Sequence, residues 1–259
     1  MQFAEADDGA RLAWREDGTG DPLLLISGQV TGLAGWDPIV PNLASTFRVI
    51  RFDHRGIGGS EEGSAESYST RGFAADARAV LDAAGTKRAH VYGHSMGGRV
   101  AQWLAIDYPE RTGALILAAT SAGGYLGTNR DREATAALTS GDPSRLEPLF
   151  FDPDWASQHR EAVHTFFTAR APRRAKRLHF RASSEHDARN LLSSVRAPTL
   201  ILHGTADVVT PLGNALALKQ YIPGSMLARV PKGRHGFHLD RPETLDWIRQ
   251  FIARKKLQL

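Results

Sequence analysis

The stretch "VYGHSMGGRV" (residues 91–100) places Ser95 between Gly93 and Gly97, after a short apolar run and before a helical pattern. This G-x-S-x-G pattern is typical of a sharp turn from a strand into a helix, with the serine at the turn. Small residues two positions on either side let the strand and the helix approach each other. The pattern alone leaves open whether Ser95 is a nucleophile or an ordinary turn hydroxyl, because a nucleophile also needs a base and an oxyanion site.

Apolar runs alternate with helical patterns along most of the chain. The runs that indicate strands are residues 22–27, 47–53, 89–93, 114–120, 199–204 and 226–230. Most are continuous, which is typical of strands buried on both faces of a parallel sheet. Helical patterns cover residues 70–85, 96–111, 210–222 and 241–256. Residues 3–17, with Asp-Gly between two alternating runs, indicate an antiparallel hairpin at one edge. The alternation predicts an α/β fold with a mostly parallel sheet.

This alternation breaks between residues 121 and 195. The segment contains the turn sequences "GDP" and "DPDW" and amphipathic stretches, and it is too long for a simple loop. Open α/β folds bind ligands at the carboxyl edge of the sheet. We therefore expect residues 1–120 and 196–259 to form the core and residues 121–195 a small helical cap over that edge. The alternative is that these helices pack elsewhere on the core.

Composition excludes several classes of protein. A chain of 259 residues suits one large domain with an insertion, and the absence of cysteine excludes disulfides and thiolate chemistry. The net charge of +4 is too small to indicate nucleic acid as a partner. The start of the chain lacks a secretory signal and no run reads as a membrane span, so we expect a cytoplasmic protein. No metal-ligand spacing or dinucleotide fingerprint is present, so neither a metal nor a cofactor is expected. The sequence predicts no oligomeric state.

One local charge concentration stands apart. Residues 170–181, "RAPRRAKRLHFR", hold six Arg or Lys residues and no acid. The simpler interpretation is a solvated helix face. The alternative is attraction of an anionic substrate or of an acidic carrier protein.

An acid and a base follow Ser95 in the chain. Asp207, in "LILHGTADVVTP", comes just after a buried strand, at the sheet edge where Ser95 is expected. An isolated aspartate there is more often a turn or helix-capping residue. Its place between the serine and the two histidines of "GRHGFHLDRPE", His235 and His238, instead matches the order Ser, Asp, His of α/β-hydrolases. Either histidine is a candidate for the base.

With these residues in place, the chain resembles the α/β-hydrolase superfamily over nearly its whole length. The similarity is carried by "LLLISGQV", "FDHRGIGGS", "GHSMGG", "PTLILHGTADVVTP" and "GRHGFHLDRPE". It is most similar to the branch of 3-oxoadipate enol-lactonases, polyketide methyl esterases and cofactor-free haloperoxidase-type esterases. The resemblance implies the α/β-hydrolase fold, a mostly parallel eight-stranded sheet flanked by helices with a small helical cap.

The resemblance also implies the catalytic residues: Ser95 as nucleophile, Asp207 as acid and His235 as base. The family places its histidine seven residues before the proline of an "RPE"-like element, an interval that His235 fits and His238 does not. The residue before that histidine is commonly glycine in the family and is Arg234 here. His238 is then expected to have a packing or loop role.

Further roles follow from the same resemblance. Many members carry His-Gly in the loop after the first core strand, where this chain reads Ser27-Gly28-Gln29. The implied oxyanion donors are the backbone N–H groups of Gln29 and Met96. The turn that contains Asp53 and Arg55 is structural in the family. Apart from the resemblance, the sequence positions of Trp36 and Trp103 are typical of the core, and Trp155, in the inserted segment, is the aromatic residue expected to contact a substrate.

The sequence therefore predicts a serine hydrolase that cleaves a carboxylic ester or lactone of a small molecule through an acyl-enzyme. Alternatives that keep the triad are a thioesterase on an acyl carrier or CoA thioester, a C–C bond hydrolase and a perhydrolase. A non-hydrolytic ligand-binding protein or pericyclase on the same scaffold is the alternative from a different class, because a fold does not dictate a function.

Overall fold

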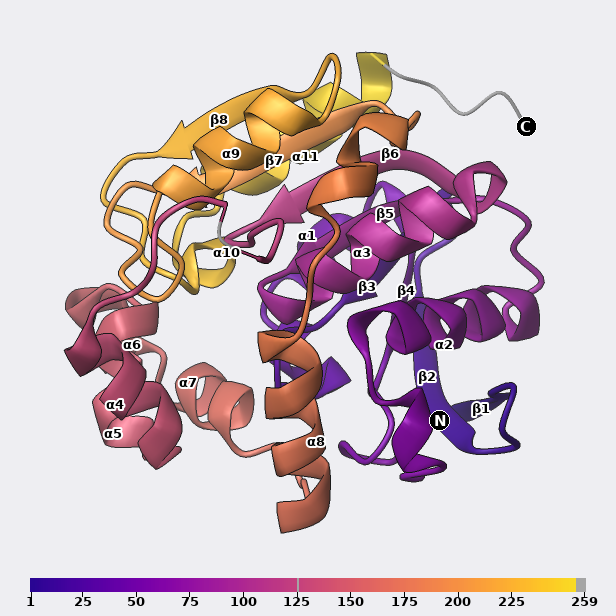
Figure 1. The fold of residues 1–259 in the computed structure, drawn as a ribbon, viewed down its shortest axis with the longest axis horizontal. Helices are drawn as coiled ribbons and strands as arrows, with labels where there is room; N and C mark the ends of the chain where they lie inside the picture. Colours follow the sequence, from indigo (N-terminus) through magenta and orange to yellow (C-terminus); the bar gives the residue numbers. More distant parts are fainter. Residues whose placement is uncertain (125, 255–259) are drawn as a thin grey trace.

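A single mixed sheet organises the chain. The computed structural model describes residues 1–124 and 126–254. Eight strands pair in the order β1-β2-β4-β3-β5-β6-β7-β8 (Figure 1). β1 and β2 pair antiparallel, as do β2 and β4, and every other pairing is parallel. The strands are β1 (Gln2–Glu5), β2 (Arg11–Asp17), β3 (Asp21–Ile26), β4 (Phe47–Phe52), β5 (Ala89–His94), β6 (Thr112–Ala118), β7 (Thr199–Gly204) and β8 (Met226–Val230). The predicted eight-stranded, mostly parallel α/β sheet is confirmed.

The central strands are apolar throughout because both faces of the sheet are covered. Every residue of β5, β6 and β7 is buried. Neighbours along one strand belong to two different core clusters: Leu24 and Val91 to one, Leu23 and Tyr92 to the other. Since successive side chains of a strand point to opposite faces, the two clusters are the two sides of the sheet.

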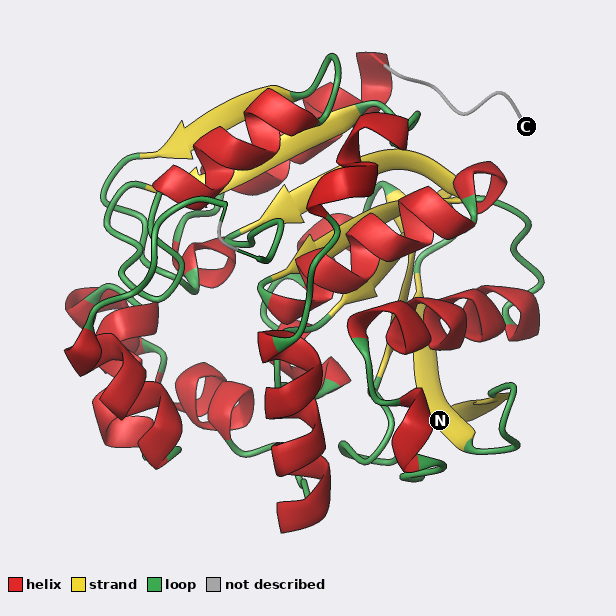
Figure 2. Cartoon of the chain, in the orientation of Figure 1, coloured by secondary structure: helices red, strands yellow, loops and turns green. Residues whose placement is uncertain are grey.

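Helices cover both faces (Figure 2). Side chains of α2, α3 and α9 belong to one cluster, and side chains of α1 and α11 belong to the other. The helices outside the β6–β7 connection are η1 (Leu33–Trp36), α1 (Val40–Ala44), η2 (Ala65–Ser67), α2 (Thr70–Ala83), α3 (Met96–Asp107), η3 (Pro109–Arg111), α9 (Gly213–Tyr221), α10 (Phe237–Asp240) and α11 (Glu243–Arg254). Trp36 and Trp103 are buried as predicted.

The long connection between β6 and β7 is helical, as predicted. Its described elements are α4 (Arg132–Ser140), α5 (Pro143–Phe150), α6 (Pro153–Gln158), α7 (Arg160–Phe167), α8 (Arg173–Ser184) and η4 (Arg189–Ser194). We call α4–α8 the inserted helices. In Figure 1 they gather at the lower left and bottom of the view, apart from the helices that cover the sheet.

The sequences read as turns in this segment are helix starts. Asp142 and Asp152 are the N-caps of α5 and α6, where each carboxylate accepts a backbone N–H, and a proline follows each of them. Aspartate at the N-cap with proline at the first helical position is a favoured helix beginning. The interpretation of "GDP" and "DPDW" as turns alone was therefore wrong.

Two predicted helix boundaries also shift. α3 ends at Asp107, because Pro109 cannot continue its hydrogen bonding, and a 3₁₀ turn takes up the rest of the predicted segment. α9 begins at Gly213 rather than at residue 210. There the side chain of Asp207 accepts the backbone N–H groups of Val209 and Thr210 and holds the chain in a turn.

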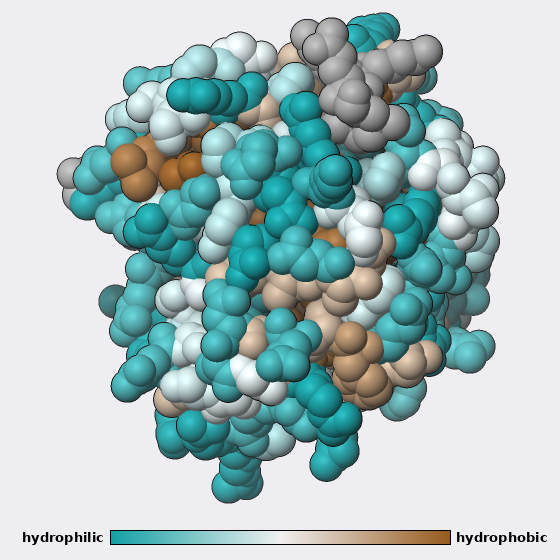
Figure 3. Space-filling view, turned by 90° about the vertical axis from the view of Figure 1, so that its right-hand side faces the viewer, coloured by the Kyte–Doolittle hydropathy of each residue, from teal (hydrophilic) through white to brown (hydrophobic). Residues whose placement is uncertain are grey.

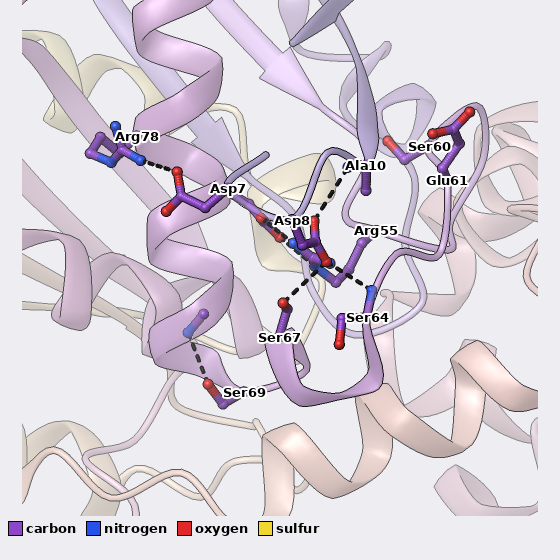
Figure 4. A network of polar contacts seen from close by, with 12 residues as sticks. Asp7, Asp8, Ala10, Arg55, Ser60, Glu61, Ser64, Ser67, Ser69 and Arg78 are labelled. Carbon is purple, nitrogen blue, oxygen red and sulfur yellow. Dashed lines mark hydrogen bonds and ion pairs between the residues drawn. The ribbon is translucent and has the colours of Figure 1, made fainter. Parts of the chain in front are cut away.

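The amino-terminal hairpin is tied to the core by Arg55. Its guanidinium donates to both carboxylate oxygens of buried Asp76, at 2.6 and 2.8 Å, and to Asp8 at 2.7 Å. Figure 4 shows that the Asp8 carboxylate also receives bonds from Ala10, Ser64 and Ser67. Burial opposes ionisation of Asp8, yet Arg55 and these N–H donors hold its pKa below the usual value. Arg55 thus braces the fold, in agreement with the structural role implied for its turn.

The face of the molecule shown in Figure 3 is largely polar. Hydrophilic side chains dominate it, and hydrophobic residues appear in smaller areas between them. Within the described residues, no helix combines the length and the apolar character needed to cross a membrane.

Two buried histidines dock α8 onto the core. His54 Nε2–H donates to the Ser27 carbonyl at 3.1 Å, and His179 Nε2–H donates to the Arg55 carbonyl at 3.0 Å. The ring centroids lie 5.8 Å apart. Burial lowers the pKa of His54 to about 3 and that of His179 to about 4. Both rings are therefore neutral in the folded protein near pH 7.

This contact makes stability depend on pH. In the unfolded chain His179 has a pKa near 6.5 and is protonated below that pH, whereas in the folded protein it stays neutral down to about pH 4. Acidification therefore favours the unfolded chain. We expect His179→Gln, which keeps an N–H donor, to make the free energy of unfolding fall less steeply between pH 6.5 and 5, by up to about 1.4 kcal/mol per pH unit. Urea unfolding at several pH values measures this. Exposed His164→Gln should keep the wild-type slope; an unchanged slope in His179→Gln would contradict the expectation.

Candidate active site

Ser95 stands at the junction of β5 and α3 in a strained backbone conformation. Its φ of 56° and ψ of −118° belong to a region that residues other than glycine seldom adopt. Two bonds hold it there: Ser95 N–H donates to the Ala118 carbonyl at 2.9 Å, and Thr120 Oγ1–H donates to the Ser95 carbonyl at 2.7 Å. An outlier of this kind, over-determined by its surroundings, marks a site for functional interpretation.

Glycines make this turn sterically feasible. A Cβ on Gly93 would lie 2.3 Å from the Gly97 carbonyl oxygen, and one on Gly97 would lie 2.0 Å from the Ile26 carbonyl oxygen. Both distances are far below van der Waals contact. Glycine at both positions is therefore what lets α3 start directly against the end of β3.

The three residues predicted as nucleophile, acid and base lie in one hydrogen-bonded chain. His235 Nε2 is 2.9 Å from Ser95 Oγ, and His235 Nδ1 is 2.8 Å from Asp207 Oδ2. Since an ionised carboxylate only accepts, Nδ1–H donates to Asp207 and leaves Nε2 to accept the Ser95 hydroxyl. The three side chains follow β5, β7 and β8, whose carboxyl ends share one edge of the sheet.

Asp207 is buried and fully engaged. Its Oδ1 accepts the N–H groups of Val209 and Thr210 at 2.9 and 2.8 Å. Burial by itself would raise the pKa of Asp207, but His235 and these N–H donors hold the pKa below its usual value. His203 Nε2 lies 3.7 Å from Asp207 Oδ2 and donates instead to the Thr210 carbonyl at 2.6 Å. Asp207 therefore presents a negative charge to His235.

The second histidine near the chain end does not join this chain. His238 packs between His94, at a ring centroid distance of 4.1 Å, and Trp36, at 5.0 Å. Burial lowers its pKa well below the usual value. The structure thus brings His235, and not His238, to Ser95.

The loop after β3 lies directly against Ser95. A Cβ on Gly28 would be 3.4 Å from Ser95 Cβ. Ser27 braces the loop, because its Oγ accepts Trp36 Nε1–H at 2.8 Å. Within residues 1–124 and 126–254, neither the Gln29 N–H nor the Met96 N–H donates a hydrogen bond. Met96 begins α3, where the helix dipole favours negative charge. Both N–H groups are thus without a partner among the described residues, and their role as oxyanion donors stays a prediction.

Two neighbours of His235 escaped the sequence reasoning. His94 Nε2–H donates to the His235 carbonyl at 2.8 Å. The Phe150 ring meets the His235 ring at 4.8 Å and 87°. No spacing rule connects residues this far apart in the chain, so no sequence signal pointed to these two contacts.

The remaining sequence predictions are less directly placed. Trp155 stacks on His159 at 4.4 Å and packs on Phe151 at 5.3 Å, so its contact with a substrate stays a prediction. In the basic stretch, Arg174 pairs with Glu62 at 2.6 Å, while Phe180 is exposed. An acidic carrier as partner also stays a prediction. No group of three or more His, Asp or Glu residues in the described part of the chain could hold a metal ion.

Comparison with known proteins supports the same family. A family model for the alpha/beta hydrolase fold matches residues 21–242. The chain belongs to this family.

Similar proteins extend over nearly the full chain. A putative carbamate hydrolase RutD of Azorhizobium caulinodans is 31% identical over 255 residues, covering 95% of this chain and 96% of that protein. A hydrolase from Pseudomonas aeruginosa PA01 superposes with a TM-score of 0.82 at 30% identity, covering 97% of this chain and 98% of that one. Est816, described as an N-acyl homoserine lactone degrading enzyme, gives a TM-score of 0.80 at 28% identity, covering 96% and 100%. The relatives are hydrolases, which supports hydrolase activity for this chain.

The turn from β5 into α3 at Ser95, which we call the elbow, gives a stability prediction. Because its Cβ would meet the Ile26 carbonyl, we expect Gly97→Ala to lower the free energy of unfolding by about 3 kcal/mol or more. Gly85, with φ +61° and open space around its Cβ, is the control. Gly85→Ala should cost only the conformational penalty of about 1–2 kcal/mol. Chemical denaturation measures both, and equal losses would contradict the steric explanation.

Proposed function

We propose that this protein is a serine hydrolase that cleaves a carboxylic ester or lactone of a small molecule through an acyl-enzyme. The observation that carries the proposal is the chain of hydrogen bonds from Ser95 through His235 to Asp207. The lactone-degrading structural neighbour adds support. In this proposal residues 1–120 and 196–259 are the catalytic core and residues 121–195 are its cap.

In the first half of the reaction, Ser95 Oγ attacks the substrate carbonyl while His235 Nε2 takes its proton. The tetrahedral oxyanion accepts the N–H groups of Gln29 and Met96, and each such donor is typically worth about 10²–10³ in rate. Asp207 keeps Nδ1 protonated and stabilises the imidazolium that forms. His235 then protonates the leaving alcohol, and Ser95 remains acylated.

In the second half, water replaces the alcohol. His235 removes a proton from the water, which attacks the acyl carbonyl at the same oxyanion site. Collapse of the second tetrahedral intermediate releases the carboxylic acid, and His235 returns the proton to Ser95 Oγ. No step needs a metal or a cofactor.

A carbamate is a second candidate substrate, favoured by the relative named a putative carbamate hydrolase. Its carbonyl carries an ester-like oxygen and a nitrogen, so the same nucleophile and oxyanion site serve it. Thioesters, C–C bonds and peracid formation also use this machinery, and they differ in the leaving group or in the attacking nucleophile.

Replacing the nucleophile tests the chemistry. Ser95→Ala should lower kcat for ester hydrolysis by at least about 10⁴, with an unchanged melting temperature, because no other group can form the acyl-enzyme. Fluorophosphonate labelling should disappear in the same variant. Exposed Ser184→Ala is the control and should keep wild-type turnover and labelling. Near wild-type hydrolysis by Ser95→Ala would refute the proposed function.

The bond cleaved is tested by a substrate panel. p-Nitrophenyl esters of increasing chain length, an enol-lactone, an aryl carbamate and an acyl thioester are compared by kcat/KM. We expect an ester or the lactone to rank first, since the lactone-degrading neighbour shares the site's fold at 28% identity. A thioester ranking first, with salt-sensitive turnover, would instead favour the carrier-dependent alternative.

A further inference from the structure

The loop that carries His235 is bonded along its backbone to the inserted helices. The segment involved is residues 148–152, "PLFFD", at the end of α5, which we call the strap. His235 N–H donates to the Leu149 carbonyl at 3.2 Å, and Gly236 N–H donates to the Phe150 carbonyl at 2.7 Å. The Arg234 side chain donates to the Pro148 carbonyl. Arg234, which stands where the family commonly has glycine, thus adds a bond to the strap.

Hydrogen bonds from and to side chains also hold Asp152, the last residue of the strap, to the loop that carries His235. Asp152 N–H donates to Asp240 Oδ2 at 2.7 Å, and Arg241 donates to the Asp152 carboxylate at 3.1 Å. Asp240 belongs to α10, which begins two residues after His235. The strap is therefore held to the histidine loop on both sides of His235.

The strap packs so closely against Gly236 that no side chain would fit at this position. A Cβ on Gly236 would lie 2.3 Å from Cε1 of buried Phe151 and 3.0 Å from the Phe150 carbonyl oxygen. The edge-on contact of Phe150 with the His235 ring completes the packing. On the opposite side, His94 donates to the His235 carbonyl. His235 is thus fixed between the nucleophile elbow and the strap.

We propose that the strap is a positioning element for His235 and that Asp240 latches it in place. The proposal rests on the proposed function, in which His235 is the base. Proton transfer requires Nε2 to stay within hydrogen-bond reach of Ser95 Oγ, and a misplacement of about 1 Å costs about 10²-fold in rate. Strap residues do not touch the reacting atoms in this scheme; they act through the position of His235.

The other end of the inserted helices is anchored elsewhere. Gly58 N–H donates to the Arg170 carbonyl at 2.8 Å, and the Phe166 ring packs 3.5 Å from where a Cβ on Gly35 would stand. These contacts lie beside η1, which follows the Gln29 loop. Loosening the strap should therefore disturb the base and leave the oxyanion loop in place.

The latch needs an acceptor oxygen rather than a charge. Asp240 Oδ1 is buried and has no partner among the described residues, and burial raises the pKa of Asp240. An asparagine at this position keeps a carbonyl oxygen for Asp152 N–H. Asp240→Asn therefore keeps an acceptor for the Asp152 N–H and Asp240→Ala does not, while both variants remove the carboxylate.

The experiment measures kcat and KM for the best ester of the panel. We expect Asp240→Ala to lower kcat about tenfold or more with KM within about twofold, and Asp240→Asn to restore kcat to within about twofold of wild type. The control is Glu147→Gln, which breaks the ion pair with Arg160 at 2.7 Å just before the strap and should leave kcat unchanged. Fluorophosphonate labelling of Ser95 should slow in Asp240→Ala in parallel with kcat.

Several outcomes would contradict the proposal that the strap positions His235. Wild-type kcat in Asp240→Ala, an equal loss in Asp240→Asn, or an equal loss in Glu147→Gln each does so. If Asp240→Ala fails to fold, Arg241→Gln decides, since it removes the partly exposed ion pair with Asp152 and the 3.3 Å bond to the Asp240 carbonyl but leaves the Asp240 carboxylate in place. An about threefold loss of kcat there supports the strap, and an unchanged kcat refutes it. Hydrolysis that persists in Ser95→Ala, run in parallel, would instead refute the proposed function itself.

Discussion

The contact between the backbone of α3 and the end of β3 is the constraint on which the rest of the site depends. Gly97 stands so close to the Ile26 carbonyl that the turn between β5 and α3 adopts a conformation with no room for a Cβ at this position. That conformation puts Ser95 in its strained geometry and starts α3 at Met96. The same approach brings Gly28 against Ser95. One steric requirement therefore sets the positions of the Ser95 hydroxyl, of the Met96 N–H proposed as an oxyanion donor and of the loop that contains Gly28.

Electrostatics around the site follow from burial. His94, His203 and His238 surround the Asp207–His235 pair, and burial lowers the pKa of each, so all three are neutral at pH 7. Neutral rings can donate to carbonyls, as His94 and His203 do, without competing for the Asp207 charge. In the proposed mechanism His235 becomes an imidazolium, and a protonated ring at any of these positions would repel it. The carboxylate of Asp207 is thereby left to act on His235.

Local physics explains which parts of this arrangement the sequence could predict. The strands were predicted from apolar runs along the chain, and the turn at Ser95 was predicted from glycine at two fixed positions within residues 91–100. Asp207 was found from its place after a strand, whereas His235 was separated from His238 only by a family interval. The strap was missed because its contacts join residues more than 80 positions apart, such as Asp152 and Asp240. The starts of α5 and α6 were misread because Asp-Pro is common to turns and to helix N-termini.

The strap limits how far the inserted helices can vary without affecting His235. A change within residues 148–152 alters the surroundings of His235 directly, and under the proposed function it is expected to change the rate of proton transfer. Trp155 and His159 stack on each other in α6 and the turn that follows it, and Trp155 also packs on Phe151 of the strap. If the strap positions the base as proposed, residues that affect the rate and residues that affect substrate preference are not sharply separated, because Trp155 packs directly on the strap.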